Sequence, residues 1–373
     1  MNKTLITKLN GRVANTELLR LGELRITIDK EDSPSSKSRS LAITVSKETP
    51  IEIVGDGYFT DGNLSANKGK SITLSSGDNT IYVSNDNVVL AILNKYNITK
   101  LNFERIDTSI SSNAKHKHFD LSSFRYCMSL TSLTLQNTST TGDISEISNL
   151  TSLTNLILSK TLIEGNLSSL SNLTSLTILQ LTDTAVTGNL SSLSNLTLLI
   201  SIQLERTSVA GDLSSLSKMT KLTNIYLRET NTSGNVSDLK GYGLEFLNVT
   251  NAVFNADSMK AFKQLRTVIL YTSSISGDVA TLSDTLSLLM APNATSKSCT
   301  WSSRKSSAKI ISMPYYLIKD NIDKMLQDQA QCQAEVTSSY KTITAKGTRT
   351  SASDAAIQTL QSKGYTVTIL PTD

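Results

Sequence analysis

The sequence predicts a mainly β protein in which a solenoid of stacked repeats lies between a small all-β N-terminal domain and an α/β cap. Three observations predict this fold class: period-two alternation near the N-terminus, a 23-residue repeat in the middle and helical spacing near the C-terminus. We expect a β domain over residues 1–97 that docks or anchors the chain, a solenoid over 98–313 and a cap over 314–373.

Short strands are expected throughout residues 1–97. The segments with alternating or apolar character are 24–28, 41–45, 51–54, 72–74, 81–83 and 88–92. Gly77-Asp78-Asn79 predicts a turn, and the charged, Ser-rich residues 29–39 predict an exposed loop. Residues 1–22 fit either an edge strand with its loop or a segment that folds against a partner.

The solenoid is predicted from a glycine that recurs at a constant spacing. The five glycines are Gly142, Gly165, Gly188, Gly211 and Gly234. A fixed period of this length is typical of stacked units, none of which can bury its apolar face alone. A first coil is expected at 98–106, the period becomes shorter after 242, and the last strands are expected at 286–290 and 310–313. The stack therefore has eight or nine coils.

Each glycine follows an L-x-x-L-x-L-x-x-T segment, which resembles a leucine-rich repeat. The second copy contains Leu153, Leu156, Leu158, Thr161 and Gly165. Thr stands where the family usually has Asn, and its hydroxyl can also satisfy backbone groups at the bend after the strand. The five threonines are Thr138, Thr161, Thr184, Thr207 and Thr230. The resemblance implies a curved, right-handed solenoid with parallel strands on one face, and a binding role for that face.

Residues 314–373 have a different pattern, which predicts the cap. Residues 321–333 place apolar side chains on one helical face, and 342–345 predict a short strand. Ser351 and Asp354 resemble a capping box at the start of a second helix, and Gly364 suits its end. Residues 365–370 alternate as a strand. Such a β-α-β unit would cover the last coil and protect the edge of its sheet.

The composition argues against several classes of function. The net charge is +4 and only 18% of residues are charged, which argues against a nucleic-acid partner. Three separated cysteines, Cys127, Cys299 and Cys332, form neither a metal spacing nor a disulfide framework. Residues 1–13 lack the apolar core of an export signal, and the longest apolar run, 88–93, is too short for a transmembrane segment. We expect no membrane insertion.

The leucines should point inward, so the residues between them line the outer side of the sheet, which we expect to be concave. One column there, Lys160, Asp183, Arg206 and Glu229, alternates in sign. Such charges fit either a stabilising cross-strand ladder or a polar binding patch. Exposed tyrosines are effective contact residues. The candidate binding residues on this face are Glu205, Arg206, Tyr226, Arg228, Glu229 and Tyr271.

No catalytic or metal-binding motif is evident. Asp143, Asn166, Asn189, Asp212 and Asn235 form a column that either binds calcium or caps turns. The column has too few carboxylates per coil for calcium, which favours capping. His116 and His118 lie together in an insertion and are either metal ligands or solvated loop residues. We therefore predict a non-enzymatic protein without a cofactor or a metal.

The ends of the chain suggest where the protein acts. Segments 21–26, 57–60 and 355–369 resemble uncharacterised proteins of gut Bacteroidales and their phages. The resemblance implies a virion component, such as a head fibre, tail or other surface appendage, with residues 1–97 attached to other virion or surface proteins. The alternatives are a bacterial cell-surface adhesin and a protein-interaction scaffold. Ligands of the repeat face would be host-surface proteins or glycans, and homo-oligomerisation suits a fibre.

Overall fold

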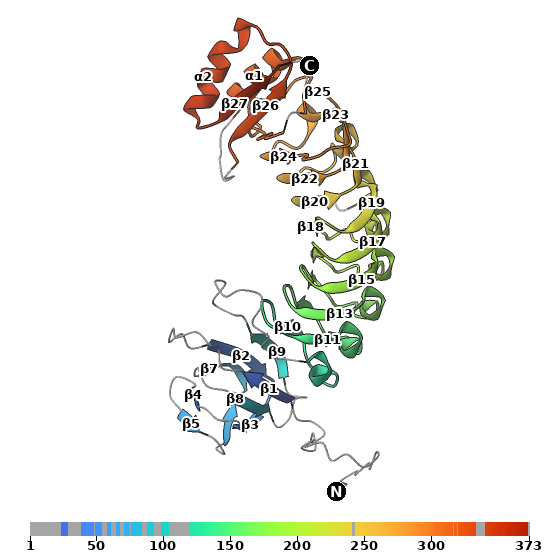
Figure 1. Ribbon diagram of the computed structural model, residues 1–373, viewed down its shortest axis with the longest axis vertical. Coiled ribbons are helices and arrows are strands. Elements are labelled where there is room, and N and C mark those ends of the chain that lie inside the picture. Colours follow the sequence, from blue (N-terminus) through green and yellow to red (C-terminus); the bar gives the residue numbers. More distant parts are fainter. Residues whose placement is uncertain are drawn as a thin grey trace.

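The protein curves into an arc, with an N-terminal β domain at one end and an α/β cap at the other (Figure 1). This computed structural model describes the ranges that follow. They are 24–28, 39–47, 49–53, 58–60, 65–67, 71–74, 76–83, 88–92, 98–103, 120–240, 243–315, 317–318, 320–332 and 340–371. Strands in parallel sheets dominate and helices are few, so the predicted fold class is confirmed.

The N-terminal strands form antiparallel pairs. They are β1 (Leu24–Ile28), β2 (Arg39–Val45), β3 (Thr49–Ile53), β4 (Tyr58–Thr60), β5 (Ser65–Asn67), β6 (Ser71–Leu74), β7 (Gly77–Val83) and β8 (Val88–Ile92). The six expected strands are present. The predicted turn at Gly77–Asn79 is wrong, because these residues pair with Val45, Thr44 and Ile43 in β2 and so begin β7.

One strand joins this region to the solenoid. β9 (Ile98–Phe103) pairs antiparallel with β2 and parallel with β10 (Ser132–Thr134). The N-terminal strands β2, β7, β4 and β5 thereby belong to the same 13-stranded sheet as the solenoid strands. Ile98 and Leu101 are fully buried in the core that the solenoid leucines form. The two regions therefore share a sheet and a core, and the division at residue 97 stays a prediction.

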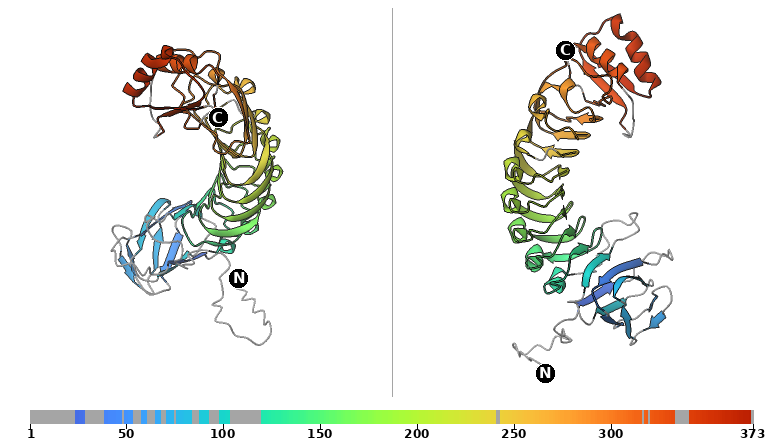
Figure 2. Two further views of the ribbon diagram at one scale, coloured as in Figure 1. Left: turned by 45° about the horizontal axis from the view of Figure 1, so that its top comes forward. Right: turned by 180° about the vertical axis from the view of Figure 1, so that it is seen from behind.

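The solenoid has two parallel sheets. The inner side of the arc carries β10, β12 (Asn155–Ile157), β14 (Ile178–Gln180), β16 (Ser201–Gln203), β18 (Asn224–Leu227), β20 (Phe246–Thr250), β22 (Thr267–Tyr271) and β24 (Leu288–Met290) (Figures 1 and 2). The second sheet comprises β11 (Thr141–Asp143), β13 (Leu162–Asn166), β15 (Ala185–Asn189), β17 (Ser208–Asp212), β19 (Asn231–Asn235), β21 (Ala252–Asn255), β23 (Ser274–Asp278) and β25 (Ser296–Thr300). With β9, the inner sheet has nine parallel strands among the described residues.

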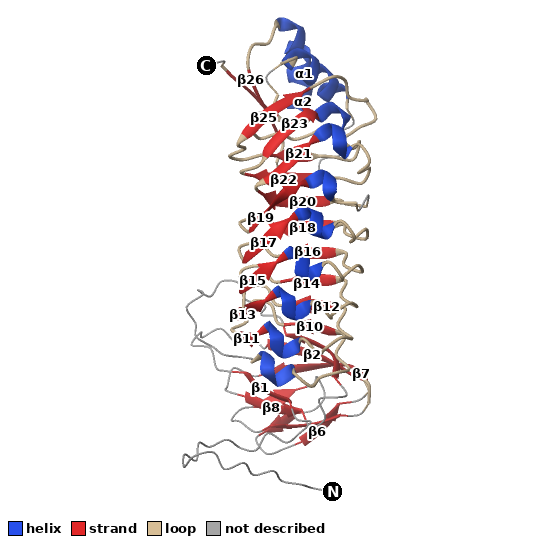
Figure 3. Ribbon diagram, turned by 90° about the vertical axis from the view of Figure 1, so that its right-hand side faces the viewer, coloured by secondary structure: helices blue, strands red, loops and turns tan. Residues whose placement is uncertain are grey.

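A short 3-10 helix follows each strand of the second sheet from β11 to β23, and Figure 3 shows these helices stacked in a column. They are η3 (Ile144–Ile147), η4 (Leu167–Leu170), η5 (Leu190–Leu193), η6 (Leu213–Leu216), η7 (Val236–Asp238), η8 (Ala256–Met259) and η9 (Val279–Thr281), with η2 (Leu121–Phe124) before β10. The repeat leucines are buried as predicted; Leu153, Leu156 and Leu158 have no exposed surface.

The repeat threonines satisfy backbone groups inside each coil. Thr161 Oγ1 donates a hydrogen bond of 2.6 Å to the carbonyl of Leu158, three residues earlier. The same bond forms at Thr138, Thr184, Thr207 and Thr230, at 2.6–2.7 Å. All five threonines are buried, and this bond gives each hydroxyl a backbone acceptor. The expected role of Thr at the bend after the strand is confirmed.

The repeat glycines fit close against the preceding coil. Gly188 has φ +112°, a conformation that other residues rarely adopt. A Cβ at this position would lie 2.7 Å from Asn166 Oδ1 and 3.0 Å from the Leu167 nitrogen. The constant period of the glycines therefore reflects a backbone conformation and a close contact, both of which only glycine permits.

We predict that Gly188→Ala lowers the free energy of unfolding by about 2 kcal/mol or more, because the new methyl group is strained and meets Asn166. Urea denaturation followed by circular dichroism measures the loss. Gly243→Ala is the matched control: nothing lies within 4 Å of its Cβ position, so its effect should stay within about 0.5 kcal/mol. Equal effects of the two substitutions would contradict this explanation of the repeat.

The cap contains α1 (Ile322–Gln331), α2 (Asp354–Ser362), β26 (Thr342–Lys346) and β27 (Thr366–Leu370). The predicted strand at 310–313 is wrong: single bridges pair Ser312 with Leu288 and Met313 with Ile343. These bridges carry the parallel pairing from β24 to β26, so the cap continues the inner sheet. No helix of the described residues has both the length and the apolar character needed to cross a membrane.

The start of α2 also differs from the prediction. The capping residue is Thr350, whose Oγ1 accepts a hydrogen bond from the Ala352 nitrogen, and a short 3-10 turn precedes the helix. Ser353 makes no capping bond to the helix with its side chain, so the predicted capping box at Ser351 and Asp354 is wrong. The cause is tertiary, because Asp323 of α1 accepts from the Thr350 nitrogen and hydroxyl. Gly364 has φ +83° just after the helix, as predicted.

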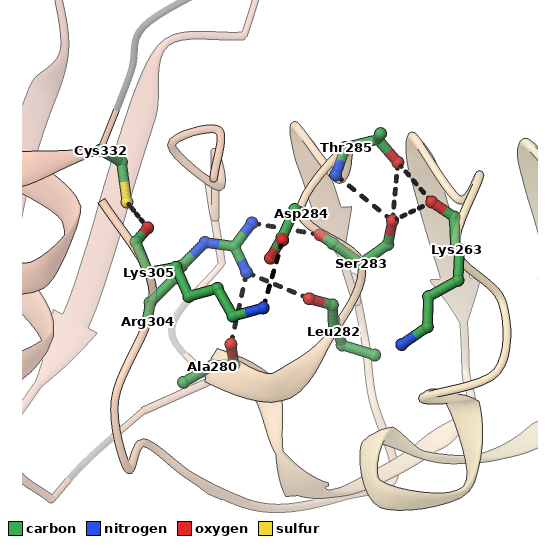
Figure 4. Close-up of polar contacts among 9 residues, drawn as sticks. All are labelled: Lys263, Ala280, Leu282, Ser283, Asp284, Thr285, Arg304, Lys305 and Cys332. Atoms are coloured by element: carbon green, nitrogen blue, oxygen red, sulfur yellow. Dashed lines mark hydrogen bonds and ion pairs between the residues drawn. The ribbon is translucent and has the colours of Figure 1, made fainter. Parts of the chain in front are cut away.

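A buried arginine joins the cap to the last regular coil (Figure 4). Arg304 is 6% exposed, and its guanidinium donates to the carbonyls of Ala280, Leu282, Ser283 and Lys309 at 3.0–3.4 Å. Burial lowers the pKa of this guanidinium from its usual value. The fork of donors thus satisfies carbonyls at and just after the end of η9. The Arg304 backbone nitrogen donates to the Asp328 carboxylate of α1 at 3.2 Å, which joins this coil to the cap.

Candidate functional site

The six predicted site residues lie on three coils of the inner sheet, those of β16, β18 and β22. Glu205 and Arg206 follow β16, and Tyr226 lies in β18. Arg228 and Glu229 follow β18, and Tyr271 ends β22. Arg206 and Glu229 are exposed, and the other four are half-buried. We call Glu205, Arg206, Tyr226, Arg228, Glu229 and Tyr271 the inner patch.

Arg228 connects the β18 and β22 coils of the inner patch. Its Nη2 lies 2.7 Å from Glu229 Oε1, and its Cζ lies 4.5 Å from the centre of the Tyr271 ring. The second contact spans β20, since Tyr271 belongs to the strand after it. A guanidinium over an aromatic face is attracted by the negative charge of the ring face. Arg228, Glu229 and Tyr271 are therefore one contact group.

Glu205 and Tyr226 have partners that the sequence analysis did not name. Asn248 Nδ2 donates a hydrogen bond of 2.9 Å to Glu205 Oε1. The Tyr226 ring stacks on Phe246 with centroids 4.4 Å apart and planes inclined by 20°. Asn248 and Phe246 both lie in β20, where the spacing from the preceding inner strand is shorter than in the earlier coils. The sequence offered one signal for these contacts, the polar residue Asn248 at the position of β20 that is in register with Tyr226.

The alternating charge column is only partly an ion-pair ladder. Arg206 makes two hydrogen bonds to the Asp183 carboxylate, at 2.5 and 2.7 Å. These bonds hold the pKa of Asp183 below its usual value and raise that of Arg206. Glu229 pairs with Arg228 of its own coil rather than with Arg206 of the preceding one. The positive charge of Arg228 also acts on Glu205, whose pKa it lowers in opposition to burial.

The charged column has an unusual backbone. Lys160, Asp183, Arg206 and Glu229 all have φ between 53° and 58°, in the left-handed region. Asn occupies the same position in other coils, at Asn137, Asn251 and Asn293. Asn tolerates this conformation better than long or charged side chains do. Lys160, Arg206 and Glu229 are therefore present despite a backbone preference for another residue type.

Three polar atoms of this face are buried without a partner among the described residues: Thr182 Oγ1, Arg228 Nε and Asn248 Oδ1. Asn248 and Thr182 are each 7% exposed. Buried polar groups without partners are rare in folded proteins and commonly mark an unfilled interaction. In addition, burial raises the pKa of Glu205 above its usual value, although Arg206 and Arg228 act in the opposite direction.

We predict that Glu205→Gln stabilises the protein at neutral pH, with a Tm increase of about 1–2 °C. The folded state raises the pKa of Glu205, so it binds the proton more tightly than the unfolded state does. The contribution of Glu205 to wild-type stability should therefore fall as pH rises from about 4.3, the unfolded pKa of Glu, through the higher folded value. Glutamine removes this cost and still accepts from Asn248. Calorimetry at pH 7 and pH 4 should give a difference between the two proteins that disappears at pH 4. A destabilised variant at pH 7 would contradict the prediction.

The Asp and Asn column of the outer sheet caps helices. Asp143, Asn166, Asn189 and Asp212 each accept a hydrogen bond from the backbone nitrogen two residues later, at 2.7–2.9 Å. Asn235 makes no such bond with its side chain. The capping interpretation is confirmed at four of the five positions. His116 and His118 lie outside the described residues.

The sequence matches no family model and no curated protein. Among solved structures, it is similar to an internalin from Listeria monocytogenes str. 4b F2365, at 19% identity over 76% of this chain and 85% of that one, with a TM-score of 0.46. It is similar to the LRR ectodomain of the Arabidopsis thaliana receptor kinase GASSHO1/SCHENGEN3, at 16% identity over 74% and 39% of the two chains and a TM-score of 0.48.

A third similar structure is the plant peptide hormone receptor RGFR1 in complex with RGF2, at 18% identity over 68% and 41% of the chains, with a TM-score of 0.48. The chain spans less than half of the length of these two plant receptors. An LRR ectodomain is thus among the solved structures that this chain resembles. The resemblance of the ends to proteins of gut Bacteroidales and their phages stays a prediction.

Proposed function

We propose that the chain is a non-enzymatic binding protein that holds a protein partner on the inner patch. The observation that carries this proposal is the concentration of paired charges and aromatic rings on four consecutive coils of the inner sheet. Arg228 contacts both Glu229 and Tyr271, and Tyr226 stacks on Phe246. Arg and Tyr are the residue types that most often contribute large binding energies at protein interfaces.

Two further features support the proposal. Arg206 and Glu229 occupy left-handed positions where Asn would fit with less strain, and such strain is found where function requires the side chain. Arg228 Nε and Asn248 Oδ1 are buried without partners among the described residues. The stacking of the coils requires neither feature, because the leucines, threonines and glycines of the same coils already hold the coils together.

The proposal is tested by binding of the labelled, purified protein to washed cell envelopes and to gradient-purified phage particles from the source culture. The patch variant carries Glu205→Gln, Arg206→Asn, Tyr226→Gln, Arg228→Gln and Tyr271→Thr. We expect the variant to bind its target at least tenfold more weakly, because contacts of interface Arg and Tyr residues are commonly worth about 1.4 kcal/mol or more in total, which is a factor of ten in affinity.

A matched control changes three exposed serines of the 3-10 helices, Ser145, Ser168 and Ser191, to alanine. This control should bind as the wild-type protein does. Circular dichroism establishes that both variants are folded. Wild-type binding by the folded patch variant would exclude the inner patch as the contact surface.

We further propose that the protein is a phage virion component attached through residues 1–97, with the bacterial cell surface as the alternative location. This finer proposal rests on the sequence of the two ends and on the inner face of the solenoid. We predict that mass spectrometry finds the chain in stoichiometric amounts in gradient-purified particles and depleted from washed envelopes. Enrichment in the envelopes instead would exclude the virion and favour a surface adhesin.

A further inference from the structure

Glu205 differs from the other charged residues around it. Asp183 pairs with Arg206, Glu229 with Arg228, and Glu245 with Arg266 at 3.2 Å. Among the residues that the structure describes, Glu205 forms no ion pair, and its side-chain hydrogen bond comes from the neutral amide of Asn248. The two nearby guanidinium groups are thus already engaged with other carboxylates.

Asn248 reaches Glu205 across an intervening coil. It lies in β20, and its Nδ2 spans β18 to bond Glu205 just after β16 at 2.9 Å. The other amide atom, Oδ1, has no partner in the described part of the chain, although Asn248 is only 7% exposed. Asn248 thus donates one hydrogen bond to the Glu205 carboxylate, and its own amide oxygen is an unpaired acceptor in the same group.

An aromatic ring completes this group. Tyr226 is the register partner of Asn248, and its ring is half-buried against Phe246. Carboxylate, amide oxygen and aromatic face are the three groups that bind an ammonium or guanidinium in proteins. All three come from neighbouring coils of one sheet, about 4.8 Å apart.

We propose that Glu205, Asn248 and Tyr226 form a subsite for a lysine or arginine side chain of the protein partner; this inference rests on the proposed function. The incoming cation donates both to the Glu205 carboxylate and to Asn248 Oδ1, while Asn248 Nδ2 keeps its hydrogen bond to Glu205 Oε1. The carboxylate gains an ion pair, and the unpaired amide oxygen gains a partner.

The electrostatics of the unbound site agree with the binding of a cation beside Glu205. Burial raises the pKa of Glu205 despite Arg206 and Arg228, so the carboxylate is incompletely compensated without a ligand. A cation in direct contact would favour the ionised form.

The test uses the full chain and two small probes, N-acetyl-lysine methylamide and its uncharged analogue N-acetyl-norleucine methylamide. Asparagine-selective ¹⁵N labelling follows the side-chain amide of Asn248, assigned with Asn248→Asp. We expect the lysine probe to shift this resonance saturably, with a roughly millimolar Kd. The norleucine probe should bind at least tenfold more weakly. Equal shifts with both probes would overturn the proposal.

Two variants make the test specific. Glu205→Gln should weaken binding of the lysine probe at least tenfold. The control is Glu245→Gln, which removes a partly exposed carboxylate of the β20 coil and should bind the probe as the wild-type protein does. Unchanged binding in Glu205→Gln would also overturn the proposal. The thermal transition of Glu205→Gln establishes that this variant is folded.

Failure of this inference can be told apart from failure of the proposed function. In one outcome, the patch variant loses target binding while Glu205→Gln binds the lysine probe as the wild-type protein does. That result would reject the cation subsite and keep the inner patch. Binding of the lysine probe by a protein whose patch variant still binds its target would keep the subsite and reject the inner patch as the partner's main contact.

Discussion

The stack depends on the carboxylate or amide oxygen that lies beneath the glycine of the next coil. In the first regular repeat this oxygen is Asp143 Oδ1, which accepts from the Ser145 nitrogen at 2.7 Å and caps η3. A Cβ on Gly165 would lie 2.5 Å from the same oxygen. One side chain thus starts the 3-10 helix of its own coil and sets how closely the next coil approaches. Because the side chain caps the helix, the residue is Asp or Asn. Because the next coil lies so close to its oxygen, the residue above it is glycine.

These repeated interactions explain which features the sequence predicts well. Leu156, Thr161 and Gly165 have equivalents with the same surroundings in the other 23-residue repeats, so their spacing alone indicates burial, a hydrogen bond and a left-handed turn. The errors arise where a segment depends on a partner that is distant in sequence. Gly77–Asn79 has the composition of a turn, but its pairing with β2 makes it a strand. Thr350 caps its helix because Asp323 holds it there.

The inner patch was predictable in position but not in its contacts. Alternation within each strand places Glu205, Tyr226 and Tyr271 on one face, whatever their neighbours are. Two of the observed contacts, Glu205 with Asn248 and Arg228 with Tyr271, span an intervening coil. A comparison of adjacent repeats considers only nearest neighbours, and the change in repeat length before β20 obscures the alignment of Asn248 with Tyr226. Long side chains on a tightly spaced sheet therefore create pairs that the period does not reveal.

Two kinds of position in each coil differ in how much they vary along the stack. Positions that serve the stack are nearly invariant from coil to coil, because leucine, threonine and glycine are each required by a contact that recurs. Positions of the inner face change at almost every coil: Ile157, Gln180, Gln203, Tyr226 and Asn248 follow one another in a single column. The recurring contacts of the described coils do not require this variation, and at Asn248 it leaves a buried oxygen unpaired. This variation of the inner face, beside the constancy of the positions that hold the stack, is what the proposed binding role of that face leads us to expect.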